Sequence, residues 1–485
     1  MKSSLRWHVG SGALALVGLC FGPIAVAQIE VTPRLQVLQT WTDTANLDVN
    51  GTNGDFITTI SPGVNISGAT ARVQTFIDYT LNGLVFWKDS SNSDIRHQLQ
   101  AAVNTEVIRD RFFVDVRGGI QQQFQNFGGQ IVNFQQNFTQ NRITVQNYAV
   151  NPRWQEEIGS FATATAQYTF RITELEREGD ASPVGALSDN IGHSGSFSLK
   201  SGPAFQKLRW DWTTRYQSNN RTFNDLRFER ASSILDLDYN FSRKLSLLGS
   251  VGYEEFSDNT LREDQESVVW DVGFRFTPGP RLSLEGRVGE RFGGTVFSAS
   301  ASYRFSQTDT LQASYSEDVN VPNQLGANRF GNVVDLDGDN IPDFDEPIDE
   351  ILGQDAFLTD AVFQQKSGQL TLARNLRRTS ASVNAFWQQR NFAANDFTTE
   401  VYGASLGGQY RLDGAQSIAA NVTYRNTKFP NRGSDNFIAI SPSYTYTISP
   451  NLNASARYNF SKRFSNSAAL DRTINSISLT FAATF

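Results

Sequence analysis

Apolar side chains recur at every second position in one segment of this chain after another. At the C-terminal end, the alternating apolar residues are Ile477, Leu479, Phe481, Ala483 and Phe485. Side chains alternate between the two faces of a β-strand, so each such segment has one apolar face and one face that water can wet. The segments are about ten residues long, and no comparable stretch has the period of an amphipathic helix. The pattern therefore predicts an all-β chain.

The connections between these segments are short and long in turn. Short turns are expected at 68–69, 108–111, 202–203, 242–243, 278–280, 377–378, 413–414 and 449–451, and long loops near 43–54, 84–93, 124–141, 173–190, 255–266, 320–360, 391–398, 427–436 and 462–472. Outer-membrane β-barrels have short periplasmic turns and long extracellular loops. We count about 22 strands, within a range of about 18–24, and an even number places both termini in the periplasm.

Aromatic residues gather near both ends of the expected strands. Outward positions carry Trp41, Tyr79, Tyr216, Tyr253, Tyr315, Trp387, Tyr424 and Tyr458 near the loop ends, and Tyr239, Phe241, Phe274, Phe276, Tyr303, Phe305, Tyr410, Tyr444 and Tyr446 near the turn ends. Amphipathic rings are favoured at both interfaces of a membrane, so these positions predict two girdles. The alternative is the ordinary enrichment of aromatic residues in strands. With the alternation, the girdles predict a transmembrane, antiparallel, up-and-down β-barrel.

Average composition does not separate this prediction from a soluble all-β protein. The mean hydropathy is −0.37. No stretch beyond the N-terminal segment approaches the roughly 20 apolar residues that a membrane helix needs. In a barrel only alternate residues face lipid, so the average conceals the apolar face. The alternation, the loop asymmetry and the girdles therefore decide the fold class.

The first 27 residues predict a cleaved secretory signal peptide. Lys2 and Arg6 precede a short apolar run, and residues 25–27 (Ala-Val-Ala) supply a small-residue cleavage motif. The barrel is then expected over 28–485 as a single domain. The only cysteine, Cys20, lies in the signal, so the mature chain would have no disulfide and no cysteine metal site. It would keep 40 basic and 49 acidic residues, a net charge of −9, which argues against a nucleic-acid partner.

The first expected strands resemble a known group of proteins. The sequences VTPRLQVLQTWTDTANL at 31–47, DFITTISPGVNISG at 55–68 and IDYTLNGLVFW at 77–87 resemble the outer-membrane β-barrel proteins associated with PEP-CTERM sorting and exopolysaccharide gene clusters. The resemblance is clearest over this part and continues as barrel pattern to the C-terminus. It implies a role in exporting polysaccharide across the outer membrane, and it carries over no catalytic residues. Barrels of this class commonly end in an aromatic residue that the barrel assembly machinery reads, here Phe485.

The long loop expected at 320–360 contains the sequence DLDGDNIPDFDE at 335–346. Its candidate oxygen ligands are Asp335, Asp337, Asp339, the carbonyl of Ile341, Asp343 and Glu346. Calcium loops have this spacing, because oxygen ligands at alternating positions close around the ion and a final carboxylate can bind it bidentately. Asn340 stands where an EF-hand has glycine, and asparagine tolerates the left-handed conformation. We predict an extracellular calcium site here, against the alternative of a solvated acidic loop.

Residues expected to face the lumen carry both signs of charge. They include Arg72 and Asp78, Asp115 and Arg117, Asp236 and Asp238, Glu285 and Arg287, and also Arg171, Arg304, Arg411, Arg425 and Arg457. One interpretation is a hydrated wall whose charges pair across neighbouring strands, and the other is a selectivity field inside a pore. No sign dominates, so neither anion nor cation preference is predicted. We expect no separate plug domain, because strand one begins next to Gln28, so loops, a partner or nothing would fill the lumen.

These features favour a conduit in the outer membrane of a Gram-negative cell. Its expected partners are membrane lipid, the polysaccharide or another polar polymer, and periplasmic export components. The alternatives are a porin for small solutes, and a structural or adhesive barrel with calcium-braced surface loops. After the signal only His97 and His193 remain as histidines, neither in a recognisable motif, and both are expected at the surface. The chain has no phosphate loop or dinucleotide fingerprint, so we predict that it is not an enzyme.

Overall fold

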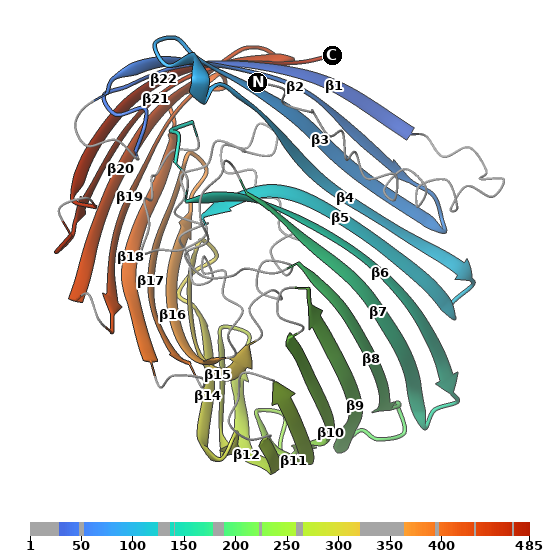
Figure 1. The fold of residues 1–485 in the computed structure, drawn as a ribbon. Coiled ribbons are helices and arrows are strands. Elements are labelled where there is room, and N and C mark those ends of the chain that lie inside the picture. The colour runs from blue at the N-terminus through green and yellow to red at the C-terminus, as the bar shows by residue number, and fades with distance from the viewer. Residues whose placement is uncertain are drawn as a thin grey trace.

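The computed structural model describes residues 29–47, 53–124, 136–139, 141–177, 189–222, 226–258, 265–320, 363–392, 397–430, 433–467 and 470–485. These residues form a 3-10 helix, η1 (Ser90–Asn92), and 22 β-strands (Figure 1). The strands are β1 (Ile29–Thr42), β2 (Asp55–Ala69), β3 (Val73–Phe86), β4 (Asp94–Ile108), β5 (Phe112–Phe124), β6 (Arg142–Ile158), β7 (Ala162–Arg177), β8 (Asn190–Ser201), β9 (Leu208–Arg221), β10 (Leu226–Asn240), β11 (Leu245–Asp258), β12 (Gln265–Gly279), β13 (Leu282–Arg291), β14 (Gly294–Arg304), β15 (Asp309–Asn320), β16 (Phe363–Asn375), β17 (Thr379–Phe392), β18 (Phe397–Arg411), β19 (Gln416–Phe429), β20 (Gly433–Ser449), β21 (Leu452–Phe464) and β22 (Arg472–Thr484). In this part of the chain, no helix has the length and apolarity that crossing a membrane requires.

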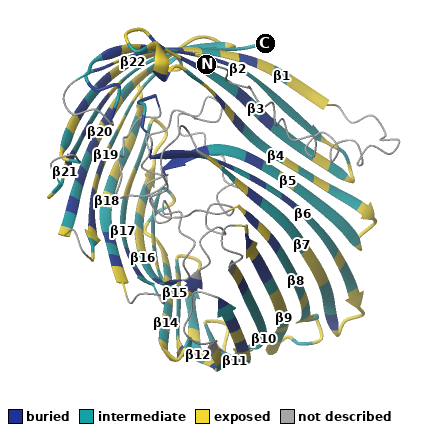
Figure 2. Ribbon diagram, viewed as in Figure 1, coloured by how far each residue is buried: buried dark blue, intermediate teal, exposed yellow. Residues whose placement is uncertain are grey.

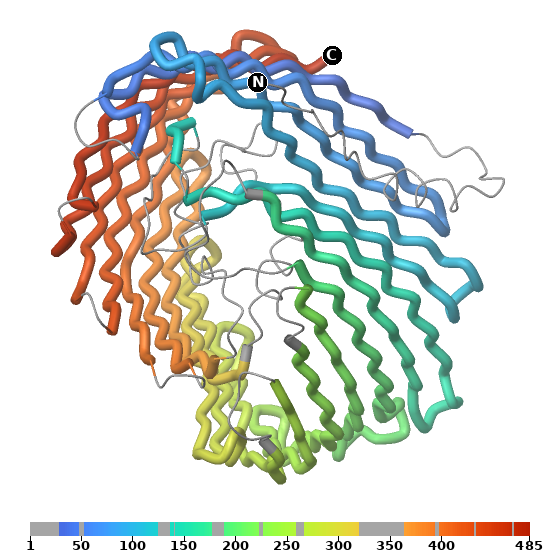
Figure 3. Tube along the Cα trace, in the orientation of Figure 1, coloured from blue at the N-terminus to red at the C-terminus, as the bar shows by residue number. Residues whose placement is uncertain are grey.

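The strands form one closed antiparallel barrel. Each strand pairs with its neighbours in the sequence, and β1 also pairs with β22 (Figure 3). The closing register runs from Arg34 opposite Thr484 to Thr42 opposite Ser476. Beyond it, the amide of Phe485 donates to a carbonyl of β1 at 2.9 Å. The prediction of an antiparallel barrel of about 22 strands is confirmed.

The two faces of the wall reverse the pattern of a soluble core. On β22, the outward Leu479 and Phe481 are 51% and 53% exposed, whereas the inward Ser476 and Ser478 are 1% and 3% exposed. Bands of exposed residues cross the strands throughout the barrel (Figure 2). Large apolar side chains are normally among the most buried residues of a soluble protein. An apolar outer face around a polar interior is the arrangement of a membrane β-barrel.

The two rims differ in their longest connections as the sequence predicts. One rim has turns of two to six residues, such as 280–281 and 202–207, and the other has loops as long as 321–362. The strands run further into several loops than expected, so the connection expected at 427–436 is only 430–432. The shortest connection on the loop rim joins β13 and β14 by Phe292 and Gly293 alone. Both residues have positive φ, 57° and 73°, as a two-residue hairpin turn requires.

Prolines interrupt the hydrogen-bonded ladder at three places. Next to Pro62, Pro152 and Pro442, the pairing with the following strand skips two positions and then resumes. Proline has no amide hydrogen to donate, so each interruption follows directly from the sequence. The strands continue in register on either side, and the wall stays closed.

The interruption between β14 and β15 is longer and contains no proline. Only residues 299–304 of β14 pair with residues 310–315 of β15. Residues 294–298 pair with β13 and residues 316–320 pair with β16, but the two segments do not pair with each other. We call these two facing segments the β14–β15 seam.

Candidate functional site

The inner wall is the candidate site, because alternation places most of the polar side chains there. On a single strand, β19, the inward Thr423 and Arg425 are 3% and 4% exposed, and the outward Ile418 is 44% exposed. Opposite residues of paired strands point to the same face, so the register extends this assignment around the barrel. The lumen is thus lined by hydroxyl, amide and charged groups.

A chain of alternating charges crosses the inner wall from β9 to β13. The contacts, in order, are Arg209–Asp238 (2.7 Å), Asp238–Arg275 (2.8 Å), Arg275–Glu285 (2.9 Å), Glu285–Arg287 (3.2 Å) and Arg287–Asp271 (3.1 Å). Asp236 also accepts a hydrogen bond from Ser250 at 2.8 Å. We call this set the central ion-pair network. It confirms that charges of the predicted lumen-facing set pair across strands, although each contact is partly screened by water.

A second cluster lies nearer the loop rim, where β10, β11 and β13 end. Glu254, only 1% exposed, accepts hydrogen bonds from Arg230 and from Arg291, the latter at 2.7 Å. Arg230 also lies 3.6 Å from Asp318 of β15 and donates to the carbonyl of Val319 at 3.4 Å. We call these five residues the rim cluster. Because β10 and β15 are five strands apart in the wall, the end of β15 must lean across the lumen to reach it.

A buried ion pair connects β1 with β3 across β2. Arg34 donates to Asp78 at 2.6 Å and also to Thr80, and the ion-paired side chains are 8% and 0% exposed. The guanidinium passes over Gly63, where a Cβ would lie 2.8 Å from its Nε, so a larger residue would displace it. Arg72, predicted to face the lumen beside Asp78, lies instead in the turn at 70–72. That prediction was wrong because the turn begins later than the alternation suggested.

Parts of two predicted loops lie inside the barrel. A cluster on the inner wall near the loop rim combines loop and strand residues: Ala45, Phe138, Ile57, Leu84 and Phe86. Asn46 and Phe138 form a parallel bridge between the two loops. Apolar residues at inward positions are covered by these segments rather than by water. Of the expected ways to fill the lumen, inward folding of loops therefore holds for this part of the chain.

The outward aromatic residues near the loop ends are hydrogen-bonded to acceptors of the wall. The pairs are Tyr216–Glu229 (2.5 Å), Tyr253–Glu266 (3.0 Å), Trp270–Glu290 (3.3 Å), Tyr315–Glu317 (2.8 Å), Trp387–Glu400 (2.8 Å), Tyr424–Asn436 (2.8 Å) and Tyr458–Asn475 (2.8 Å). A ring that is apolar on its body and bonded at its polar tip suits the boundary between lipid and water. The outward placement predicted for these aromatics, Trp270 apart, is confirmed.

His97 and His193 lie among the same outward aromatic residues. The Nδ1 atoms of His97 and His193 lie 2.7 Å from the hydroxyls of Tyr79 and Tyr168 respectively. The two imidazoles are on β4 and β8, so the fold does not bring them together. Among the described residues, no three His, Cys, Asp or Glu side chains converge as a metal site. The candidate calcium ligands Asp335, Asp337, Asp339, Ile341, Asp343 and Glu346 lie outside the described residues.

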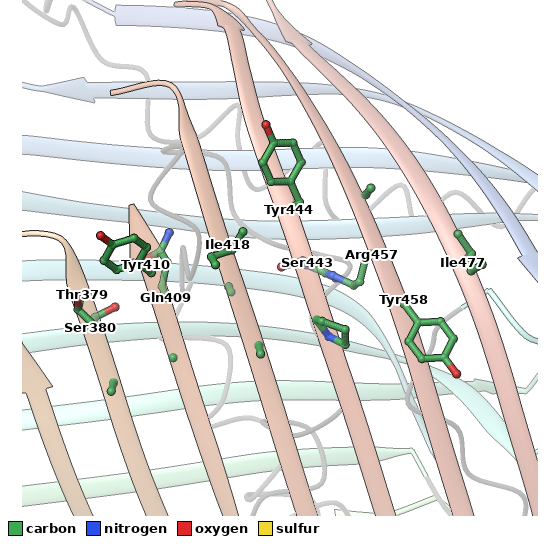
Figure 4. Close-up of a pocket in the computed structure, with 16 residues that line it drawn as sticks. Thr379, Ser380, Gln409, Tyr410, Ile418, Ser443, Tyr444, Arg457, Tyr458 and Ile477 are labelled. Carbon is green, nitrogen blue, oxygen red and sulfur yellow. The ribbon is translucent and has the colours of Figure 1, made fainter. Parts of the chain in front are cut away.

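A shallow apolar groove crosses the outward face of β17 to β22 (Figure 4). Its floor is a row of small residues, Ala381, Gly408, Ala420, Pro442 and Ala456, one on each of five neighbouring strands. Larger side chains border the row, among them Tyr444 and Tyr458, and the volume is 810 Å³. In a membrane, acyl chains would fill this groove, so we assign it to the lipid-facing surface.

Comparison with known proteins places the fold among outer-membrane β-barrels. No family model matches the chain, and no curated protein sequence matches it. The FrpB iron transporter from Neisseria meningitidis is similar in structure, with a TM-score of 0.56 and 10% identity over 94% of this chain and 82% of that chain. The ferric enterobactin receptor PfeA from Pseudomonas aeruginosa, a mutant in complex with enterobactin, has a TM-score of 0.54 and 9% identity over 94% and 81%. At these identities the likeness concerns the fold alone.

Proposed function

We propose that this protein is a conduit in the outer membrane of a Gram-negative cell, with both termini periplasmic, and that it exports a polar polymer of the polysaccharide class. The observation that carries the proposal is the inner wall, where charges of both signs are paired with each other among amides and hydroxyls. Such a surface offers many hydrogen bonds and no dominant sign, which suits a neutral, hydroxyl-rich chain better than an ion. The resemblance of the first strands to exopolysaccharide-associated barrels points the same way.

Uptake of a small solute is the second candidate. Two of the similar solved structures are an iron transporter and a ferric enterobactin receptor, which favours this alternative at the level of the fold. Outer-membrane transporters of 22 strands have a plugged lumen, and loop residues of this chain do lie against the inner wall. The paired inner charges are compatible with both candidates, so identification of the transported molecule is needed to distinguish them.

Membrane placement is tested by two neighbouring alanines on one strand. Ala420 is outward on the floor of the apolar groove, and Ala419 faces the lumen. An arginine on the lipid-facing side near the bilayer midplane costs about 2–4 kcal/mol. We therefore expect Ala420→Arg to lower the free energy of unfolding in liposomes, measured with urea, far more than Ala419→Arg. Equal effects of the two variants would contradict membrane placement.

The cargo is tested by deletion of the gene and complementation. We expect the deletion strain to lose secreted polysaccharide or to trap it in the periplasm, and the wild-type gene to restore secretion. Normal secretion together with a growth defect on one nutrient would favour uptake instead. Planar-bilayer recording of the purified barrel separates both from a structural or adhesive scaffold, which should pass little current.

A further inference from the structure

The β14–β15 seam coincides with a short hairpin in the wall. β13 and β14 have 10 and 11 residues, whereas β12 and β16 have 15 and 13. The turn residue Phe292 folds toward the inner wall and packs edge-on against Phe256 of β11, with ring centroids 6.2 Å apart. The tip of this hairpin is therefore held against the inner cluster of Phe228, Phe256 and Val319.

The end of β15 is held away from β14 by contacts across the lumen. Val319 is 6% exposed and packs with Phe228 and Phe256 of β10 and β11. Arg230 of the rim cluster binds the carbonyl of Val319 and lies 3.6 Å from Asp318. These contacts bend residues 316–320 inward, which explains why pairing with β14 stops without a proline.

A cavity of 560 Å³ lies at this break. Its lining includes Val296, Phe297 and Ser298 from the β14 edge and Glu317 and Asp318 from the β15 edge, together with the inner face of β9 to β13. The volume lies within the range of about 300–1,000 Å³ that is usual for small-molecule sites. The cavity thus joins the lumen to the open edge of the wall.

The inner lining of the cavity is polar and carries both signs of charge. Asp211, Arg215, Asp236, Asp271 and Arg287 all contribute to it. Arg215 is exposed, and none of the described residues forms an ion pair with it. A strongly anionic group would meet the neighbouring carboxylates, and a cation would meet the arginines. An uncharged group rich in hydroxyls can use both as donors and acceptors.

The outer border of the seam is apolar on the β14 side, whereas on the β15 side Glu317 accepts a hydrogen bond from the outward Tyr315 and forms an ion pair with Lys366 at 3.2 Å. Phe297 is outward and 52% exposed, and on the same side Val288 of β13 and Trp270 of β12 are 39% and 44% exposed. The seam begins on the loop side of Tyr315, where the outward aromatics mark the boundary between lipid and water, so water or a polar ligand can satisfy its unpaired backbone groups. A ligand that crosses the seam therefore meets a polar cavity at one end and, at the other, the outer edge of the membrane beside the exposed Phe297.

We propose that the β14–β15 seam is a lateral portal that binds an amphiphile with a carbohydrate head and an apolar chain. The head occupies the cavity against β9 to β13, and the chain passes between β14 and β15 into the membrane. The proposal rests on the proposed membrane placement, and it does not depend on export of a polymer.

The openness of the seam is tested by pairs of introduced cysteines in a chain whose only native cysteine, Cys20 in the predicted signal peptide, is replaced by serine. Ala301 and Ala313 are paired across β14 and β15. Phe297 and Glu317 would be opposite each other if the same register continued. We expect the double variant A301C/A313C to form a disulfide, because paired Cβ atoms lie about 4.5–5.5 Å apart. The double variant F297C/E317C should remain reduced and be joined only by a long bismaleimide.

The ligand is tested with dodecyl maltoside that carries a diazirine in its alkyl chain, added to the full barrel in liposomes. We expect residues 294–298 and 316–320 to be labelled at least about tenfold more than the outward groove at Ala420, a difference of about 1.4 kcal/mol in binding. Bismaleimide closure of F297C/E317C should abolish the enrichment, and the A301C/A313C disulfide should leave it intact. Heat-modifiable migration on gels verifies that each variant is folded.

Two outcomes would overturn the portal. One is a disulfide in F297C/E317C that forms as fast as in A301C/A313C, since the seam would then be closed. The other is even labelling around the outward wall of a folded, inserted barrel, which would leave the proposed conduit intact. Failure of membrane placement is recognised separately by the Ala420→Arg and Ala419→Arg pair.

Discussion

The β1–β2 pair and the β14–β15 pair are both antiparallel strand pairs of the barrel wall, but they differ in how far their pairing extends. The first pair keeps its register over 14 positions, from Ile29 opposite Gly68 to Thr42 opposite Asp55. The second keeps it over six positions and then separates. Both consist of alternating strands joined to well-paired neighbours, so local sequence pattern does not explain the difference.

The ion pairs next to the two walls act in different directions. Arg34 and Asp78 connect strands that are neighbours but one, so their attraction draws β1, β2 and β3 together. Arg230 and Asp318 connect β10 with β15 across the lumen, so their attraction draws β15 away from β14. An ion pair between nearby strands thus holds a barrel wall closed, and an ion pair across the lumen holds it open. The position of the paired strand decides the effect more than the strength of the contact.

The largest expected effect is the loss of the buried carboxylate beside β1. Asp78→Ala removes the carboxylate partner of the buried Arg34 and should cost about 3–5 kcal/mol. Asp318→Ala is the matched variant beside β15, where the carboxylate is 52% exposed, and should cost less than about 1 kcal/mol. Urea unfolding in liposomes measures both. Similar losses in the two variants would remove the contrast between the walls.

Hydrogen exchange sharpens the comparison without any substitution. Amides of 294–298 that are directed at the gap have no strand partner, whereas residues 35–41 of β1 are paired on both sides. We expect the gap-directed amides to exchange about 100-fold faster, because their exchange needs no opening of the sheet. Mass spectrometry of the protein in nanodiscs resolves the two segments. Equal protection would show that β14 and β15 pair fully in the membrane.

A smaller effect is expected where β1 meets β22. Phe485 is 72% exposed, and only its backbone amide bonds to β1. Phe485→Ala should therefore change the free energy of unfolding of the refolded barrel by less than about 1 kcal/mol. In cells it should lower the amount of heat-modifiable barrel, because the assembly machinery is proposed to read the terminal aromatic. An unchanged amount would separate this residue from assembly.

The smallest effect on the wall is expected from the loop that follows β15. Replacement of Asp335, Asp337 and Asp339 with asparagine should abolish calcium binding by calorimetry, because the ion loses three carboxylate ligands. The unfolding free energy should change by less than about 0.5 kcal/mol, because the substitutions lie outside the paired strands. The control variant changes Asp349 and Glu350 instead and should keep binding. Calcium binding that survives the triple change would refute the ligand set.

Much of the fold could be predicted because each strand separates two environments. Alternation at segments such as 476–485 depends only on which face meets lipid, so the outward residues and the strand number follow from the chain itself. The girdles follow for the same reason. The turn at 292–293 could not be predicted in this way, because every connection on the loop rim was expected to be long.

The contacts that distinguish one wall from another could not be predicted. Arg34 and Asp78 are 44 residues apart, and alternation shows only that both face inward. Val319 of β15 packs against Phe228 of β10, five strands away in the barrel. No local sequence pattern indicates such a contact. The mixed charge of the lumen was correctly anticipated, but its division into a central network and a rim cluster needed the register.

The pairing of β1 with β22 also constrains the order of folding. Every other pairing joins strands that are consecutive in the chain, so those hairpins have short-range contacts that can form as synthesis proceeds. Residues such as Leu35 and Ala483 can meet only after everything between them has been made. Until then two strand edges stay exposed, with unpaired backbone groups that favour aggregation. We therefore expect a growing chain of this protein to need a protein that shields these two strand edges until the last strand arrives.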